Sequence, residues 1–234
     1  MRGWHRHPIG GSGVVESISV IPAAEGDRTE LWMVVRRTIN GVTRRYVEYM
    51  DRPWREGDTL ASQFYVDSGL SYSGAAVTTI SGLAHLEGQT VDVLTNGYVH
   101  PQRVVTGGQI TLQTASTSVQ VGLPCPCRYR SMRVEAAAGD GTAQGKTKRI
   151  HKAVLRFLDT AGGKYGGTFD TLDELNFRVP ADPMNQPVPL FRGDKVVTWP
   201  DGYTTDCYMI YQNDQPTAAT LVALMPQVVT NDSR

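Results

Sequence analysis

The segment from Gly139 to Thr147 is the stretch whose residue types come closest to a phosphate-binding site. A phosphate-binding loop needs a glycine, four further residues and then Gly-Lys-Ser/Thr, because the backbone N–H groups of that loop surround the phosphates. Asp140 stands five residues before Gly145, where the pattern needs glycine. An acidic side chain at that position opposes phosphate binding, so the segment predicts no nucleotide site.

His5 and His7 are the best candidates for metal ligands. Residues i and i+2 of a strand point to the same face, so these two imidazoles could share a zinc ion with a third ligand. The other histidines, His85, His100 and His151, are isolated in the sequence. A pair without a third ligand nearby is more typical of packing or surface, and we expect no metal and no cofactor.

Candidate catalytic groups do not form a pattern. Hydrolysis by paired carboxylates needs two acids held in a cleft, and covalent catalysis needs a nucleophile beside a base. Acids occur at Asp170, Asp173, Glu174, Asp201 and Asp206, but nothing in their spacing fixes a pair. The expectation is therefore that the chain has no catalytic residues and is not an enzyme, with glycan hydrolysis as the least favoured alternative.

The cysteines are few. Cys125, Cys127 and Cys207 are an odd, low number, which argues against a disulfide framework. Cys125-Pro126-Cys127 has one residue between its thiols, whereas redox pairs have two. We expect small apolar side chains or reduced thiols.

Seven aromatic residues offer a second possible chemistry, the stacking of sugars. Exposed rings could form a platform for a glycan, whereas rings in cores and cross-strand pairs would serve stability. The second interpretation is favoured, and the first is kept as an alternative function. The residues are Trp32, Tyr46, Tyr49, Trp54, Trp199, Tyr203 and Tyr211.

Charge and hydropathy exclude several classes. The chain has 234 residues and a formal net charge of zero, from 23 basic and 23 acidic residues. Proteins that bind DNA without sequence preference usually carry a basic excess, which is absent here, while neutrality favours self-association. The start of the chain has no apolar stretch typical of a secretory signal, and no run of about 18 apolar residues predicts a membrane-spanning helix. Synthesis in a cytoplasm is expected.

Two Asn-Gly pairs fix the fold class. Asn40-Gly41 and Asn96-Gly97 each lie between runs of strand-forming residues. A two-residue hairpin loop needs positive φ at both positions, which Asn followed by Gly adopts at the least steric cost. The chain is therefore predicted to be all-β and antiparallel. The apolar run from Leu31 to Val35 predicts a strand buried on both faces.

The pattern predicts three parts. Residues 1–68 form a hairpin segment of a propeller- or sandwich-like body, and residues 125–234 form its second part. Between them, residues 69–124 are poor in charge and rich in Thr, Ser, Val and Gly, with short, evenly spaced strands typical of a small inserted β-barrel. Residues 150–159 fit a helix or a strand, and a strand is favoured by the rest of the chain.

Several phrases, which together cover nearly the whole chain, resemble the C-terminal half of tail hub or nozzle (tail tubular) proteins of short-tailed bacteriophages. They are Trp4 to His7 with Gly13 to Ser17, Leu31 to Arg37 with Ile39 to Gly41, Phe64 to Leu70, Ile80 to Leu83 with His85 to Gly88, Val121 to Pro124, Gln144 to Ile150, Gly193 to Lys195 and Asp214 to Pro216. Residues 70–122 are similar to the small β-barrel known as resembling the first catalytic cysteine half-domain of ubiquitin-activating enzymes. Nothing here resembles adenylation or thiol transfer.

The resemblance implies a structural protein of the virion tail. Six copies would form a ring around the DNA ejection channel, DNA would pass without sequence-specific binding, and an adaptor, fibre or tip protein would dock. Relatives of this kind are usually longer, with a propeller-like N-terminal body. The basic pairs Arg36-Arg37 and Arg44-Arg45, joined by the Asn40-Gly41 turn, could meet acids of a neighbouring copy. The alternative from a different class is a glycan-binding β-sandwich adhesin.

Overall fold

The structure is a computed structural model of the chain. It describes residues 6–24, 26, 28–135, 137–138, 141–142, 144–183 and 186–231. The described part is all-β and antiparallel and contains no α-helix, which confirms the predicted fold class. Two compact units, Met1–Cys125 and Pro126–Arg234, divide it next to the boundary expected at residue 125. The predicted segment 1–68 belongs to the same unit as 69–124.

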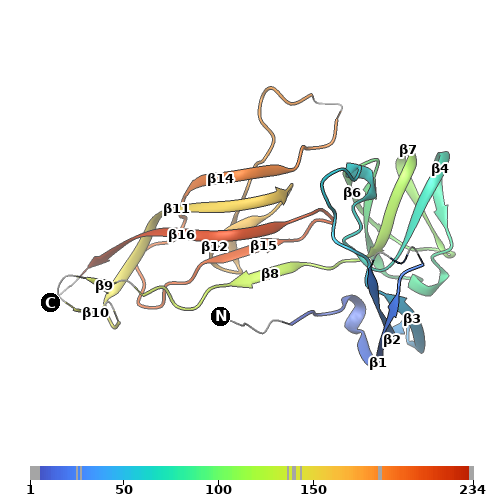
Figure 1. Cartoon of the computed structure of the whole chain (residues 1–234), viewed down its shortest axis with the longest axis horizontal. Helices are drawn as coiled ribbons and strands as arrows, with labels where there is room; N and C mark the ends of the chain where they lie inside the picture. The colour runs from blue at the N-terminus through green and yellow to red at the C-terminus, as the bar shows by residue number, and fades with distance from the viewer. Residues whose placement is uncertain are drawn as a thin grey trace. The chain divides into compact units, whose positions relative to one another are not determined.

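The first sheet of unit 1 is built on the Asn40-Gly41 hairpin. It has the order β1-β2-β3, with β1 at Val14–Pro22, β2 at Thr29–Ile39 and β3 at Val42–Tyr49 (Figure 1). Asn40 and Gly41 have φ values of 49° and 74°, as a turn of this type requires. The prediction that Leu31 to Val35 is buried on both faces is wrong, because only Val35 is buried and the sheet has no second layer over most of its area.

The second sheet of unit 1 has the order β4-β7-β5-β6. Its strands are β4 (Asp67–Ser81), β5 (Thr90–Thr95), β6 (Tyr98–Val104) and β7 (Gln109–Leu123). Asn96 and Gly97, with φ values of 50° and 84°, connect β5 to β6 as predicted. Register shifts between Ser73 and Val77 bend the long β4–β7 pair around a core of eleven buried side chains.

The expected small barrel is not closed. Strands β4 and β6 are the two edges of this sheet, and no pairing joins them within residues 67–123, all of which the structure describes. Four strands are too few to surround a filled interior, since closed barrels need more strands to make room for side chains. The sheet is an open, strongly bent layer.

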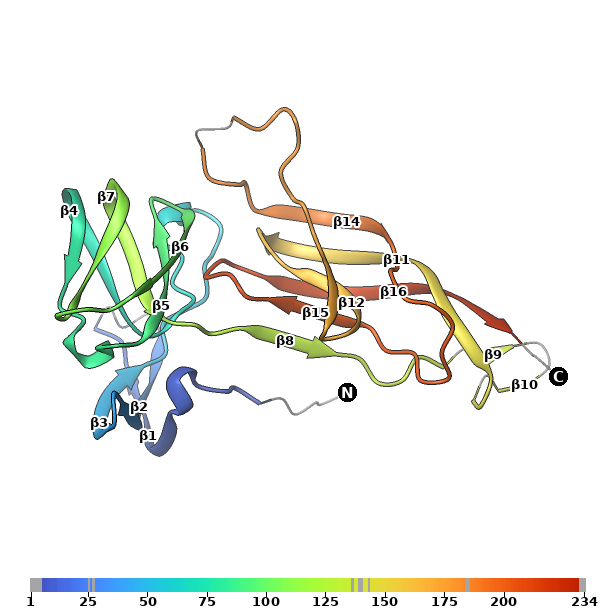
Figure 2. The ribbon, with the colours of Figure 1, turned by 180° about the vertical axis from the view of Figure 1, so that it is seen from behind.

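Unit 2 is a sandwich of two sheets. One has the order β14-β11-β16, with β11 at Thr147–Thr160, β14 at Phe191–Thr198 and β16 at Thr220–Asn231. The other has the order β13-β12-β15-β8, with β8 at Cys127–Arg130, β12 at Lys164–Thr168, β13 at Thr171–Glu174 and β15 at Ile210–Asn213 (Figure 2). A short pair joins β9 (Ala137–Ala138) to β10 (Gly141–Thr142).

The core of unit 2 explains why residues 150–159 are a strand. Ile150, Ala153, Leu155 and Phe157 of β11 are buried among aromatic residues that include Tyr211 of β15 and Trp199, which directly follows β14. Most of these β11 positions follow the two-residue period of a strand. The sequence also suggests a hairpin between 196–199 and 208–211, which is wrong: β14 pairs with β11, and β15 pairs with β12 and β8.

Candidate interaction surface

Arg37 is buried at the end of the first sheet that packs inside unit 1. Its guanidinium donates from Nε and Nη2 to the Glu48 carboxylate, at 3.1 and 2.7 Å, and from Nη1 to the carbonyl of Gly10. The N–H of Gly10 in turn donates to Asp67 at the start of β4. The Arg37 side chain has no exposed surface, so it holds the N-terminal segment to both sheets of its own chain and cannot reach a neighbouring copy.

Arg36 and Arg45 lie on the opposite face of the sheet from Arg37. They pair across β2 and β3, and both donate to Glu16 of β1, at 2.9 and 2.6 Å. The hydrogen bond from Arg45 lowers the pKa of the Glu16 carboxyl below its usual value. All three side chains are partly exposed, so the trio adds little to stability, but it leaves the two guanidinium groups aligned at the surface.

Among the four arginines predicted to contact a neighbouring copy, Arg44 is the one that remains available for such a contact. It pairs with Arg37 across the strands, so it lies on the Arg37 face, where its own side chain is exposed. No ion pair to Arg44 occurs within the described residues. The structure therefore separates the four predicted arginines into one buried residue, two surface partners of Glu16, and Arg44.

The half of this sheet away from Arg37 has side chains on two uncovered faces. We define the open half as 17–22 of β1, 29–34 of β2 and 47–49 of β3. Because directly opposed residues of antiparallel strands share a face, the register assigns each side chain. Face I carries Ile18, Val20, Pro22, Thr29, Leu31, Met33 and Glu48, and face II carries Ser17, Ser19, Ile21, Glu30, Trp32, Val34, Val47 and Tyr49.

Most of the large side chains on both faces of the open half are apolar, and several of them are accessible. On face I, Ile18 and Val20 are 65% and 62% exposed, and on face II Val47 and Tyr49 are 70% and 50% exposed. Trp32 stacks on Tyr49 with ring centroids 5.2 Å apart. No residue of face II is buried from one end of the sheet to the other. Sequence reasoning missed this surface because an apolar run looks the same whether its cover lies in the same chain or in another molecule.

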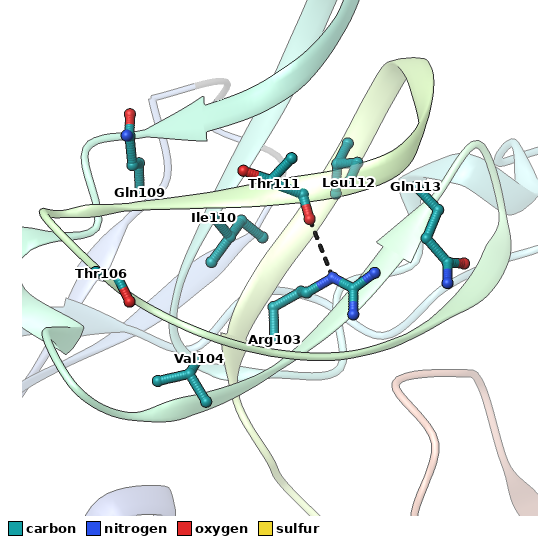
Figure 3. A pocket seen from close by; sticks show the side chains of 8 residues that line it. All are labelled: Arg103, Val104, Thr106, Gln109, Ile110, Thr111, Leu112 and Gln113. Atoms are coloured by element: carbon teal, nitrogen blue, oxygen red, sulfur yellow. Dashed lines mark hydrogen bonds between the residues drawn. The ribbon is translucent and has the colours of Figure 1, made fainter.

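A shallow depression of about 570 Å³ in the second sheet is a weaker candidate site. It lies between β6 and the start of β7, and Figure 3 shows its lining side chains. The Nε of Arg103 donates to the carbonyl of Thr111 across it, at 3.0 Å. Val104 and several polar side chains around it are exposed. The depression holds no buried charged side chain and no pair of groups placed for catalysis.

The other predicted chemical residues are scattered. Within the described residues no group of three His, Cys, Asp or Glu side chains could hold a metal ion, and His5 lies outside them. Asp206 forms an ion pair with Arg133 at 2.9 Å. Cys125 and Cys127 are exposed, whereas Cys207 is buried. The phosphate-loop candidate falls partly outside the described residues at 139, 140 and 143.

The seven aromatic residues divide between core and surface. Trp199 and Tyr211 are buried in unit 2, which confirms the packing interpretation for those two rings. Tyr46 faces His85 at 6.2 Å, and Trp54 binds the backbone carbonyl of Thr59. Tyr203 is exposed. Tyr203 and the Trp32–Tyr49 pair of face II are therefore the aromatic rings of this set that a sugar ligand could stack on.

The chain matches no protein-family model and no curated protein sequence. Among the described residues, no helix is long and apolar enough to cross a membrane.

Proposed function

We propose that this chain is a structural protein of a short bacteriophage tail, a nozzle or hub component that assembles around the DNA ejection channel in the virion. The observation that carries the proposal is the open half of the first sheet, which presents accessible apolar side chains on both faces. A sheet is stable when an apolar face is covered by a second layer. In a protein that assembles into a larger complex, a neighbouring subunit supplies this second layer.

The ring contact in this proposal uses face I. Ile18 and Val20 supply apolar area, and Arg44 supplies a charge at the other end of the same face for an acid of the next copy. Contacts between unlike surfaces close into a ring when the rotation between copies is a fraction of a full turn. Six copies, the number that the resemblance implies, would leave a channel, and an adaptor, fibre or tip protein would dock on the outside.

The absence of net charge in the full sequence fits a conduit for DNA. Each phosphate that a protein neutralises adds salt-dependent affinity, and a channel that held DNA by many such contacts would slow its passage. A neutral protein lets DNA pass without being bound.

The test is to mix the purified chain with the adaptor, fibre and tip proteins of a short-tailed phage and to measure mass and shape. Light scattering and negative-stain images should give a ring with a central hole, alone or on a partner. Arg44→Glu should lower ring yield, and Lys152→Glu, a charge reversal at an exposed site of unit 2, should not. A protein that never enters a tail complex would refute the proposal.

A second candidate function is glycan binding, which the Trp32–Tyr49 pair on face II favours. Stacked, partly exposed rings present the apolar surface that the faces of sugar rings contact. A glycan array should give binding that Tyr49→Ala removes. An array without hits would leave the tail protein as the better account.

A further inference from the structure

We propose that in the free protein face II is covered by face II of a second copy of this chain, related by a two-fold axis. The occupant is therefore an identical chain, and the contact is reversible. The inference concerns the protein before any assembly and does not rest on the proposed function. The ring contact proposed above uses face I, so the two contacts involve opposite surfaces of one sheet.

Face II needs a cover because it is apolar at its centre and uncovered along its whole length. Val34, Val47 and the Trp32–Tyr49 pair form the centre, and none of these side chains is buried. Burying apolar surface is favourable in proportion to its area, and sheets that pack face to face do so with their strands roughly aligned. A second copy of the same face brings the same flat apolar surface.

The charged side chains around this centre are arranged for self-association. At one end, Arg36 and Arg45 share the single carboxylate of Glu16, which leaves one excess positive charge. At the other end, the Nη2 atom of Arg28 lies 3.1 Å from a carboxylate oxygen of Glu30 and 4.0 Å from one of Asp51, so one cation stands between two carboxylates. Two copies that run in opposite directions bring the arginine pair of each copy toward the carboxylate end of the other, to within two residues, about 7 Å, of the level of Glu30.

A two-fold axis across the strands, at the level of Val34 and Val47, produces this arrangement. These two residues are directly opposed in the sheet, so each would meet its own copy at the axis. Arg36 and Arg45 lie two residues to one side, and Trp32 and Tyr49 two residues to the other, about 7 Å in each direction. The rotation therefore brings the arginine pair of one copy over the aromatic pair of the other.

That juxtaposition is chemically favourable. A guanidinium over an aromatic face is attracted by the ring, and arginine stacks in this way more readily than lysine because its head group is planar and weakly hydrated. Glu16 keeps both arginines aligned on the surface, at 2.9 and 2.6 Å. No charge would be buried without a partner, a condition that tight contacts must meet.

The area of the face sets the strength of the contact. Three strands about 4.8 Å apart, and nine residues at about 3.3 Å each, give a face of about 430 Å². A standard interface buries about 800 Å² of accessible surface on each partner. We therefore expect a dimer that dissociates on dilution. The zero net charge of the chain removes long-range repulsion between the copies.

The experiment is sedimentation velocity of the full chain between about 1 and about 200 μM, the range in which contacts of this size dissociate. The mass should rise with concentration from the 25.6 kDa of one chain to twice that value. Val47→Lys should raise the dissociation constant about tenfold or more, because an ammonium group at the axis would meet its own copy. Val47 is 70% exposed in one chain, so this substitution leaves the fold intact.

One further variant and two matched controls separate this contact from others. Arg45→Glu should weaken the dimer about tenfold, because a carboxylate over the partner's aromatic pair replaces a favourable contact with a repulsive one. Arg44→Glu, the neighbouring arginine on face I, should leave the dimer unchanged. Val196→Lys, at a valine of unit 2 that is 56% exposed, should also leave it unchanged.

A monomer at every concentration would overturn the proposal, and so would a dimer that tolerates Val47→Lys and Arg45→Glu. Closed rings without a dimer in the free protein would likewise overturn it. Failure to join any tail complex, with the dimer intact, would refute the proposed function and leave this inference standing.

Discussion

Replacement of Arg37 by methionine should loosen the end of the first sheet that holds the N-terminal segment. Methionine is unbranched and uncharged, so it replaces the aliphatic part of the arginine side chain while the ionic contacts are lost. Arg37 makes two hydrogen bonds to Glu48 and one to the carbonyl of Gly10. Their loss leaves a carboxylate without its partner and a carbonyl without its donor.

The cost follows from the burial of the two partners. Removal of one member of a buried ion pair destabilises proteins by about 3–5 kcal/mol, because the other charge remains buried. The Glu48 side chain keeps 17% of its surface exposed, so water relieves part of this penalty. We therefore take the lower limit, about 3 kcal/mol, which corresponds to about a hundredfold increase in the opening of unit 1.

Hydrogen exchange followed by mass spectrometry measures this opening locally. Peptides from 29–49 should exchange about a hundred times faster in the variant, whereas peptides from 150–160 of unit 2 should keep their rates. The double variant Arg37→Met/Glu48→Leu should recover most of the protection, since no unpaired charge remains. Arg44→Met, at the exposed neighbour, should change stability by less than about 0.5 kcal/mol.

Equal exchange rates in Arg37→Met and the unchanged chain would refute this reasoning, because they would mean that the buried guanidinium adds nothing to the sheet. A double variant no better than the single one would show that the lost packing of Arg37, rather than the unpaired carboxylate, accounts for the loss.

Three further substitutions test other contacts. Burial raises the pKa of Asp67 above its value in an unfolded chain, so its charge lowers stability at neutral pH, and this loss becomes smaller as the pH drops through the folded pKa. In urea titrations, Asp67→Asn should therefore stabilise unit 1 most at pH 7 and least near pH 4. A stability difference between the variant and the unchanged chain that grows on acidification would contradict this. Tyr211→Phe removes a buried hydrogen bond of 2.7 Å to the carbonyl of Gly162 and should cost about 1–2 kcal/mol by the same titration. Gly122→Ala would place a Cβ 2.7 Å from the carbonyl oxygen of Asp67 and should cost about 1–3 kcal/mol in unit 1, and a neutral effect would mean that the β4–β7 contact yields easily.

Local signals in the sequence predict local structure well. The two Asn-Gly pairs predict two turns that the structure confirms, since positive φ at consecutive residues is a requirement that few residue pairs satisfy. These features depend on a few neighbouring residues, which the sequence displays directly.

Long-range pairing is harder to predict. The apolar residues of 196–198 and 208–211 suggest a hairpin, but each strand has a better partner elsewhere in the sandwich. The four strands of residues 67–123 suggest a barrel, whereas bulges bend the sheet without closing it. Among the site residues, nothing in the sequence distinguishes the buried Arg37 from the exposed Arg36 and Arg44. Only the fold decides which of these side chains meets Glu48.

The single crossing of the chain at Cys125–Pro126 has a consequence for how such a protein can change over generations. Every sheet is made of strands from one unit alone, so a recombination event at that crossing would exchange a whole unit without removing a strand from any sheet. Insertion or replacement at this point preserves the backbone pairing on both sides. The backbone pairing of each unit is therefore complete without strands of the other, so one unit can be replaced as a whole while every sheet of the other is kept.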